Sequence, residues 1–355
     1  MTYPAPFDTW FPDAAFDGSY GFTFDTLKAV QPVRAPVELA AQWRAWRVAA
    51  RGVAAEPVVL STSVAGGREL SLIELSGVDG VRLRAWSVAP VDGLTARVGV
   101  VHGHGYGGRD EVDLRRVPDD AAAIFPVARG LGALNADVGA PKDREAHVLG
   151  GLEKPDDYVI GLCARDLWLA ADALIALAGN LPLYYVGESF GGGLGALAVP
   201  WDDRFIGATL VVPTFGQYDE RLAVPCLGSG EFQRTWVLRH PEAREQLRPF
   251  DASSTAAFFS VPVRVEAALW DQNVPPQGQF AVANAVPDLD LHVLPAGHAE
   301  YPGLAEATAA AVRGGLAHLE RVLAGQTESV SSRAGFATSI PSTASAPISS
   351  RRRGR

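Results

Sequence analysis

The chain has 355 residues, of which 48% are hydrophobic and 20% are charged, a balance typical of a soluble globular protein with a sizeable core. Its formal net charge is −9, and because residues 326–355 carry five arginines and one glutamate, the rest of the chain carries −13. A body this acidic argues against binding to nucleic acid or to an anionic membrane.

The termini and the cysteines indicate the compartment. The first residues lack the basic and apolar regions of a signal peptide, and no stretch has the 18 or so consecutive apolar residues of a membrane span. The two cysteines, Cys163 and Cys226, imply no disulfide framework. We therefore expect a cytoplasmic protein that does not contact a membrane.

Residues 1–58 are rich in aromatic residues and proline, and their pattern predicts one helix, over residues 37–50. Two strands are predicted next, over residues 70–75 and 81–89. The Asp-Gly step in the intervening residues 77–80 is a hairpin signal, so the sheet is expected to begin antiparallel.

From residue 96 onwards, continuous apolar runs alternate with longer helical segments. The predicted strands cover residues 98–101, 133–138, 183–186, 205–212, 261–269 and 289–294, and the predicted helices include 159–178 and 304–323. Strands that are apolar on both faces and alternate with helices are typical of a parallel sheet covered on both sides. The predicted fold class is α/β, with a mostly parallel sheet, an antiparallel start and helices on both faces.

We divide the chain into three parts. Residues 1–58 form a helical, aromatic extension, and residues 59–325 form the α/β domain, in which residues 213–251 look like an insertion or lid before the strand at 261–269. Residues 326–355 are rich in Ser, Thr, Ala and Pro and end in arginines, so we expect a disordered basic tail that is a solvated extension.

The segment from Gly187 to Gly192 reads GESFGG, directly after an apolar run and before a run of small residues. A strand, a sharp turn with a serine and then a helix hold a serine hydroxyl exposed above a sheet. A Gly-x-Ser-x-Gly match alone is weak, but its flanking sequence makes Ser189 the candidate nucleophile.

A serine nucleophile needs a histidine base and a carboxylate that orients it, in the chain order Ser, acid, His. His298 lies in the loop between the last predicted strand and the closing helix, whereas His240, His292 and His318 lack such a loop. Asp271 follows the strand at 261–269, where sites form in open sheets. The alternative acid is Asp251, which precedes that strand and would lie at its other end.

An oxyanion hole needs two backbone N–H donors. One is expected from Phe190, the residue after the nucleophile, and the other from Tyr106 in the glycine-rich run from Val101 to Gly108. His102 and His104 in that run lack a matching ligand cluster elsewhere, so we expect neither a metal site nor a cofactor.

These residues resemble the acetyl xylan esterase / cephalosporin C deacetylase group of α/β-hydrolases, carbohydrate esterase family 7. The resemblance covers roughly residues 60–323 and is carried by short motifs, which read RAW at 84–86, HGY at 104–106, GESFGG at 187–192, FD at 250–251, VPV at 261–263, WDQNVPP at 270–276 and GHAE at 297–300. It implies an α/β-hydrolase fold, a triad of Ser189, Asp271 and His298, and oxyanion amides of Tyr106 and Phe190.

One family element is missing from its expected place. Members usually carry Asp-x-Arg-Gly-Gln after the strand that we place at residues 133–137, where this chain reads DVGAP at 137–141. We therefore expect a divergent member whose alcohol preference or assembly differs, and a homo-oligomer stays open.

The predicted function is that of a serine esterase that removes short acyl groups, acetyl above all, from a sugar or another small alcohol. A peptidase or thioesterase on the same scaffold is the alternative within enzymes. A non-catalytic binding protein with this fold is the alternative outside them, against which the intact set of Ser189, Asp271 and His298 argues. A haloalkane-type enzyme is disfavoured because its nucleophile would be a carboxylate.

Overall fold

A nine-stranded sheet forms the centre of the computed structural model, which describes residues 6–91 and 95–337, with side chains up to residue 326. The strands are β1 (Val58–Ala65), β2 (Arg68–Ser76), β3 (Arg82–Pro90), β4 (Val98–Gly103), β5 (Ala121–Pro126), β6 (Leu183–Glu188), β7 (Phe205–Val211), β8 (Val263–Ala268) and β9 (Leu289–Leu294). Their order in the sheet is β1-β2-β3-β5-β4-β6-β7-β8-β9. The pairs from β1 to β5 are antiparallel, and every pair from β5 to β9 is parallel.

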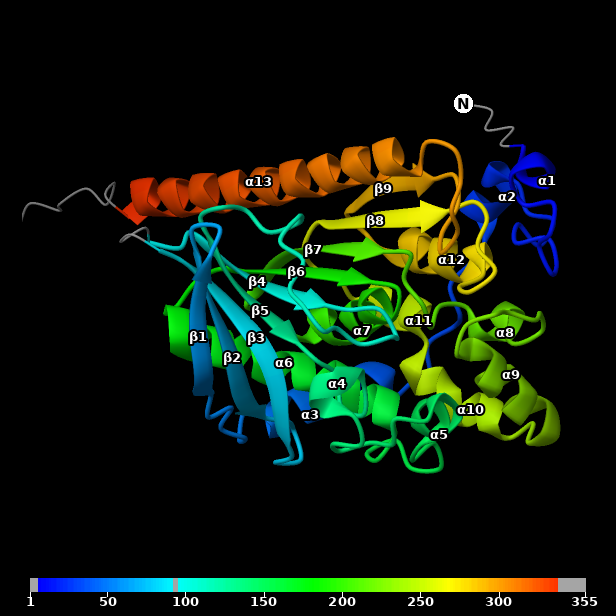
Figure 1. Ribbon diagram of the computed structural model, residues 1–355, viewed down its shortest axis with the longest axis horizontal. Helices are drawn as coiled ribbons and strands as arrows, with labels where there is room; N and C mark the ends of the chain where they lie inside the picture. Colours follow the sequence, from blue (N-terminus) through cyan, green and yellow to red (C-terminus); the bar gives the residue numbers. More distant parts are fainter. Residues whose placement is uncertain (1–5, 92–94, 338–355) are drawn as a thin grey trace, which may run out of the picture.

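Helices cover both faces of this sheet. They are α1 (Phe7–Trp10), α2 (Phe24–Ala29), α3 (Leu39–Ala50), α4 (Gly132–Asn135), α5 (Arg144–Leu149), α6 (Val159–Ala178), α7 (Phe190–Ala198), α8 (Tyr218–Arg221), α9 (Gly230–Arg239), α10 (Ala243–Leu247), α11 (Ala252–Ala256), α12 (Pro276–Ala285) and α13 (Leu304–Ala337), with short 3₁₀ turns at Val199–Trp201 and Arg248–Phe250. In Figure 1, α13 runs along one side of the sheet, and α6 and α3 lie on the other. None of the helices in the described part of the chain is both long and apolar enough to cross a membrane.

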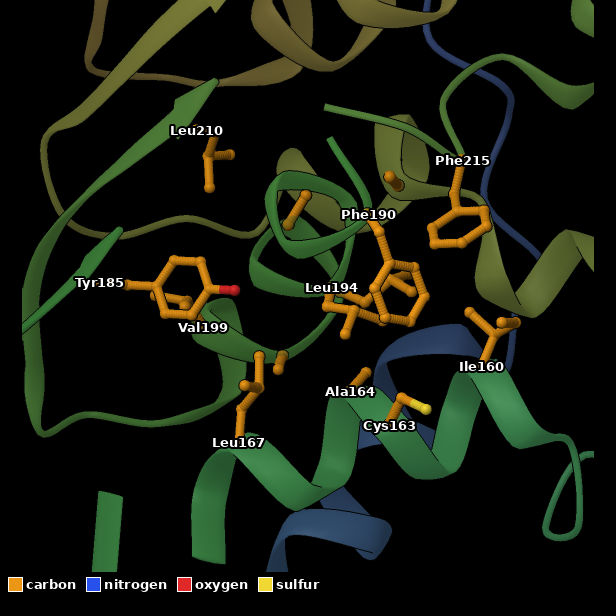
Figure 2. Close-up of a cluster of buried hydrophobic side chains, with 14 of the residues drawn as sticks. Ile160, Cys163, Ala164, Leu167, Tyr185, Phe190, Leu194, Val199, Leu210 and Phe215 are labelled. Atoms are coloured by element: carbon orange, nitrogen blue, oxygen red, sulfur yellow. The ribbon is translucent and has the colours of Figure 1, made fainter. Parts of the chain in front are cut away.

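The larger core lies between the sheet and the helices α6 and α7. Figure 2 shows Phe190 and Leu194 of α7 directed toward Ile160, Cys163 and Ala164 of α6. All five side chains are buried. Because nearly all of α6 is apolar, we expect its stability to come from this burial, which α7 shares. The helix that begins beside Ser189 is therefore anchored in the core.

The predicted fold class is confirmed. The hairpin at residues 77–80 joins β2 to β3, and the predicted strands at 98–101, 183–186, 205–212, 261–269 and 289–294 match β4, β6, β7, β8 and β9 within a few residues. The structure adds β1, an edge strand whose eight residues are all exposed, which lacks the alternation that reveals a half-buried strand.

The predicted strand at residues 133–138 is wrong. The structure places α4 there and a buried strand, β5, twelve residues earlier. The sequence of β5 begins with three alanines, which have low strand propensity, so its pairing between β3 and β4 depends on tertiary burial. Asn135 marks the difference, because its side chain hydrogen-bonds the backbone of Arg84 and Val127.

The predicted disordered tail also begins too early. Helix α13 continues to Ala337, so residues 326–337 are helical. Once a helix is nucleated each further residue adds a hydrogen bond, and no proline interrupts the sequence before Pro341. The remainder of the predicted tail, from residue 338, lies outside the described residues.

Candidate active site

Ser189 lies in the sharp turn between β6 and α7, with φ of 52° and ψ of −108°. A positive φ is strained for a residue with a side chain, so the surrounding structure must hold it. The backbone N–H of Ser189 donates to the carbonyl of Val211 at 2.8 Å, and its own carbonyl accepts from the N–H groups of Gly193 and Thr214. These bonds fix the turn at the carboxyl ends of β6 and β7.

The glycines around this turn are required by close packing. A Cβ at Gly187 would lie 2.5 Å from the carbonyl oxygen of Gly191, and a Cβ at Gly191 would lie 2.8 Å from the carbonyl carbon of Gly103. Both contacts are to backbone atoms, which cannot rotate away. The two glycines that flank the serine in the sequence motif therefore let the turn approach β4.

The structure brings Ser189, His298 and Asp271 together in one hydrogen-bonded chain. Nε2 of His298 lies 3.0 Å from Oγ of Ser189, and Nδ1 of His298 lies 2.7 Å from Oδ2 of Asp271. Because the carboxylate can only accept, Nδ1 carries the proton, and Nε2 is left to accept from the serine hydroxyl. This arrangement can remove a proton from Ser189 and hold the resulting imidazolium.

The ionisation of His298 follows from its surroundings. Burial disfavours the charged ring, but the hydrogen bond to Asp271 and the charge of that carboxylate outweigh burial, so the pKa of His298 is raised above its ordinary value. The Asp271 side chain is fully buried, whereas 22% of the His298 side chain is exposed.

The residues that the sequence analysis rejected lie elsewhere. His318 is buried in α13 and contacts the hydroxyl of Tyr184, and His240 stacks on Trp236 in the segment between β7 and α11. Asp251 accepts backbone N–H groups at the start of α11 and has no contact with His298. Of the two acids considered, only Asp271 touches the histidine.

The two predicted oxyanion amides line the same cavity as Ser189. Among the described residues, neither the backbone N–H of Tyr106 nor that of Phe190 donates to a hydrogen-bond acceptor. The N–H of Gly191 donates to the carbonyl of His104 at 2.9 Å, which ties the start of α7 to the loop that carries Tyr106. Both residues therefore line the cavity at Ser189, and within the described residues their backbone N–H groups donate to no acceptor.

Two buried histidines fix the Tyr106 loop. Nε2 of His104 accepts from the N–H of Ala128, so its Nδ1 donates to the carbonyl of Gly105. Burial lowers the pKa of His104 to about 4, which keeps the ring neutral. The hydroxyl of Tyr106 lies 2.8 Å from Nδ1 of His147. Among the described residues, no group of three His, Cys, Asp or Glu side chains could hold a metal ion.

The prediction that the family's Asp-x-Arg-Gly-Gln run is missing was made at the wrong strand, and Arg129 was overlooked as a result. Because the strand is β5, the residues that follow it are Val127 to Leu131, which read VARGL. This run has the arginine and the glycine, but Val127 and Leu131 stand where the aspartate and the glutamine would be. Arg129 is fully buried and pairs with both Asp166 and Asp79. Its carbonyl contacts Nε2 of His147 at 2.9 Å, so the element lies directly behind the Tyr106 loop.

A cavity of about 320 Å³ opens at Ser189. Its wall includes His298 and Glu188, the loop of Tyr106, and part of the insertion that we predicted over residues 213–251, from Thr214 to Gly230. The insertion forms α8, α9 and α10, so it supplies one side of the space in front of the serine.

Solved structures with the same architecture place this geometry in a known fold. Acetyl xylan esterase from Paenibacillus sp. R4 superposes with a TM-score of 0.71 at 20% sequence identity, covering 82% of this chain and 99% of that one. Acetyl xylan esterase 1 from Thermoanaerobacterium sp. JW/SL YS485 superposes at 0.69 with 21% identity, covering 85% and 99%. The chain has the α/β-hydrolase fold.

The hydrolase fold also includes enzymes with other reactions. Acylaminoacyl peptidase from Pyrococcus horikoshii superposes with a TM-score of 0.55 at 12% identity, covering 74% of this chain and 49% of that one. No model of a protein family matches the sequence, and no curated protein matches it either. The likeness therefore establishes the hydrolase fold, and the reaction has to be argued from the site.

Proposed function

We propose that the protein is a serine esterase that hydrolyses a short acyl ester, acetyl above all, of a sugar or another small alcohol. The observation that carries this proposal is the hydrogen-bonded chain from Ser189 through His298 to Asp271, at a cavity that Tyr106 and Phe190 also line. The superposition on acetyl xylan esterases and the motifs shared with that family support the ester as substrate.

In the first half of the reaction, Oγ of Ser189 attacks the ester carbonyl while Nε2 of His298 takes its proton. Asp271 holds the imidazolium, and the N–H groups of Tyr106 and Phe190 donate to the oxyanion. When the tetrahedral intermediate collapses, the alcohol oxygen takes the proton from His298 and leaves. The acyl group stays on Ser189.

In the second half, water attacks the acyl-enzyme and His298 again accepts a proton. The carboxylic acid leaves, and Ser189 regains its hydrogen. The proton transfers between Ser189 and His298 use groups that already lie within hydrogen-bonding distance of each other, and Asp271 lies within the same range of His298.

The test of the nucleophile is Ser189→Ala. Ester hydrolysis, measured with para-nitrophenyl acetate, is expected to fall by at least about ten-thousandfold, because no other hydroxyl takes part. Ser61→Ala serves as the matched control, since Ser61 is exposed on the edge strand β1, and it should keep full activity. A fluorophosphonate should label Ser189 alone, and an adduct that mass spectrometry places on another residue would reject the assignment.

A peptidase or a thioesterase is the second candidate, favoured by the peptidase of known structure that shares the fold. Matched acetyl ester, thioester and anilide substrates separate the three reactions by their kcat/KM values. A homo-oligomer remains a prediction, which light scattering tests.

A further inference from the structure

The insertion between β7 and α11 holds a buried arginine that has no acidic partner in the described part of the chain. Arg221 ends α8 and is only 3% exposed. No carboxylate of the described residues lies within ion-pair distance of its guanidinium. Its Nη1 donates to Oε1 of Gln233 at 3.2 Å, and its Nε is buried with no hydrogen-bond partner among the described residues. Because a buried charge is costly unless it is paired, this guanidinium still lacks part of its compensation.

The surroundings of Arg221 hold the guanidinium without neutralising it. The ring of Tyr218 lies 5.4 Å from it, which gives a cation–π contact. A Cβ at Gly230 would lie 1.8 Å from Nη2, so the first residue of α9 leaves room for the side chain. The acid next to Gly230, Glu231, already pairs with Arg234. The segment thus encloses a positive charge that no neighbouring carboxylate balances.

Arg165 is another buried arginine without a carboxylate within ion-pair distance among the described residues, but it donates to the backbone carbonyls of Gly161 and Asp156. Arg129 is balanced by carboxylates instead. It is fully buried as well, and it faces two carboxylates, those of Asp79 and Asp166, at 2.7 and 2.8 Å. Arg221 differs from both because its Nε has no partner among the described residues and because it forms part of the wall of the cavity at Ser189. A substrate in that cavity can supply the missing negative charge.

We propose that Arg221 binds a carboxylate of the substrate, so that the preferred ester carries a negative charge. This inference rests on the proposed esterase function and narrows its substrate class. Arg144 lines the same cavity and adds a second positive charge. Glu188 is the acid in the cavity wall, but it is exposed to solvent, which weakens its repulsion of an anionic substrate. The local field therefore favours a single anionic group even though the body of the chain is strongly acidic.

The carboxylate can lie in the acyl part or in the alcohol part of the ester, and two pairs of esters distinguish these sources. The first pair is mono-para-nitrophenyl adipate against para-nitrophenyl hexanoate, which differ in the end of the acyl chain. The second is meta-carboxyphenyl acetate against phenyl acetate. In the pair whose carboxylate reaches Arg221, kcat/KM of the wild-type protein should be higher for the anionic ester than for the neutral one by about tenfold or more. A wild-type preference for the neutral ester in both pairs overturns the inference, whatever the variants do.

The matched variants are Arg221→Gln and Arg239→Gln. Arg239 is an exposed arginine at the end of α9, so its substitution removes the same charge from the same segment without touching the cavity. Arg221→Gln should lower the ratio of anionic to neutral kcat/KM by about 10- to 100-fold, as for the loss of a charge-assisted hydrogen bond, while Arg239→Gln leaves the ratio unchanged. An unchanged ratio in a folded Arg221→Gln protein also overturns the inference.

Binding of free adipate, measured by calorimetry, separates this inference from the proposed function because it needs no catalysis. The wild-type protein should bind adipate at least about tenfold more tightly than Arg221→Gln. If adipate binds in this way but no ester is cleaved, the esterase proposal fails and the anion site stands. If esters are cleaved but adipate binding and the ester ratio do not depend on Arg221, the anion site fails and the esterase proposal stands.

Discussion

Replacing Asp271 by asparagine tests the hydrogen-bonded chain most sharply, because every acceptor position of this carboxylate is used. Oδ2 accepts from Nδ1 of His298 at 2.7 Å and from Nε2 of Gln279 at 3.0 Å. Oδ1 accepts from the N–H groups of Asn273 and Val274 at 2.8 and 3.0 Å. An asparagine has one carbonyl oxygen and one NH₂ group, so it cannot serve both sets of donors.

Either orientation of the asparagine amide creates a conflict. With the NH₂ group toward the backbone, two N–H donors face it directly. With the NH₂ group toward the imidazole, it faces the amide of Gln279, which cannot turn because its Oε1 accepts from Ala268 and its Nε2 also donates to Val274. The second orientation retains the bonds to Asn273 and Val274, so we expect the protein to adopt it.

That orientation inverts the histidine tautomer. The new NH₂ group donates to Nδ1 of His298, which moves the ring proton to Nε2. A protonated Nε2 cannot accept the proton of Ser189, and the base is lost. The kcat/KM for para-nitrophenyl acetate should therefore fall roughly ten-thousandfold, which corresponds to about 5.5 kcal/mol of transition-state stabilisation. The contact with Gln279 should cost about 1–3 kcal/mol of folding free energy, measured by urea unfolding.

Asp251→Asn is the matched control. Asp251 is buried too, and it accepts hydrogen bonds from the N–H and O–H groups of Ser253 and from the N–H of Tyr218. Burial nevertheless raises the pKa of its carboxyl group. Its loss should destabilise the start of α11 but leave kcat/KM of the folded protein within a few fold of wild type. A fully active Asp271→Asn protein together with an inactive, folded Asp251→Asn protein would refute the assignment of the acid.

Two further predictions concern ionisation and stability. The kcat/KM should rise with pH through an apparent pKa above the ordinary imidazole value of about 6.5. The reason is that His298 must be neutral to accept a proton, and Asp271 raises the pKa of His298 despite burial. A pH profile with a midpoint clearly below about 6.5 would contradict this prediction. Arg129→Leu should lower the free energy of unfolding by about 3–5 kcal/mol, because it leaves Asp166 and Asp79 without their partner. Urea unfolding measures this, and a loss below about 1 kcal/mol would show that the cluster is not needed for stability.

The sequence indicated the three residues of the hydrogen-bonded chain because each lies beside a strand that burial makes recognisable. Ser189 follows β6, and Asp271 lies three residues after the end of β8. His298 follows β9 in a glycine-containing loop. In a parallel sheet the carboxyl ends of strands meet at one edge, so the order of these residues along the chain was enough to predict that they meet in space.

The errors arose where local sequence and tertiary packing disagree. The alanines of β5 carry no strand signal of their own, and misplacing that strand hid the Arg-Gly element at Arg129. Arg221 was missed for a different reason. Its segment reads as a charged insertion, and only the structure reveals that its guanidinium is buried in the wall of the cavity without a carboxylate partner among the described residues.

The contacts between the N-terminal extension and the site were the hardest to predict from the sequence, because they join residues more than 200 positions apart. The ring of Phe11 stacks on Trp270, next to Asp271, with 3.9 Å between ring centroids, and the carbonyl of Gly18 accepts from the N–H of Asp271 at 2.9 Å. The hydroxyl of Tyr20 donates to the carbonyl of Pro225 in the insertion at 2.8 Å. One short segment therefore holds both the loop that carries the acid and the segment that carries Arg221. A misplaced carboxylate cannot keep the histidine in the correct tautomer, so we expect these contacts to influence the proposed reaction only by positioning Asp271.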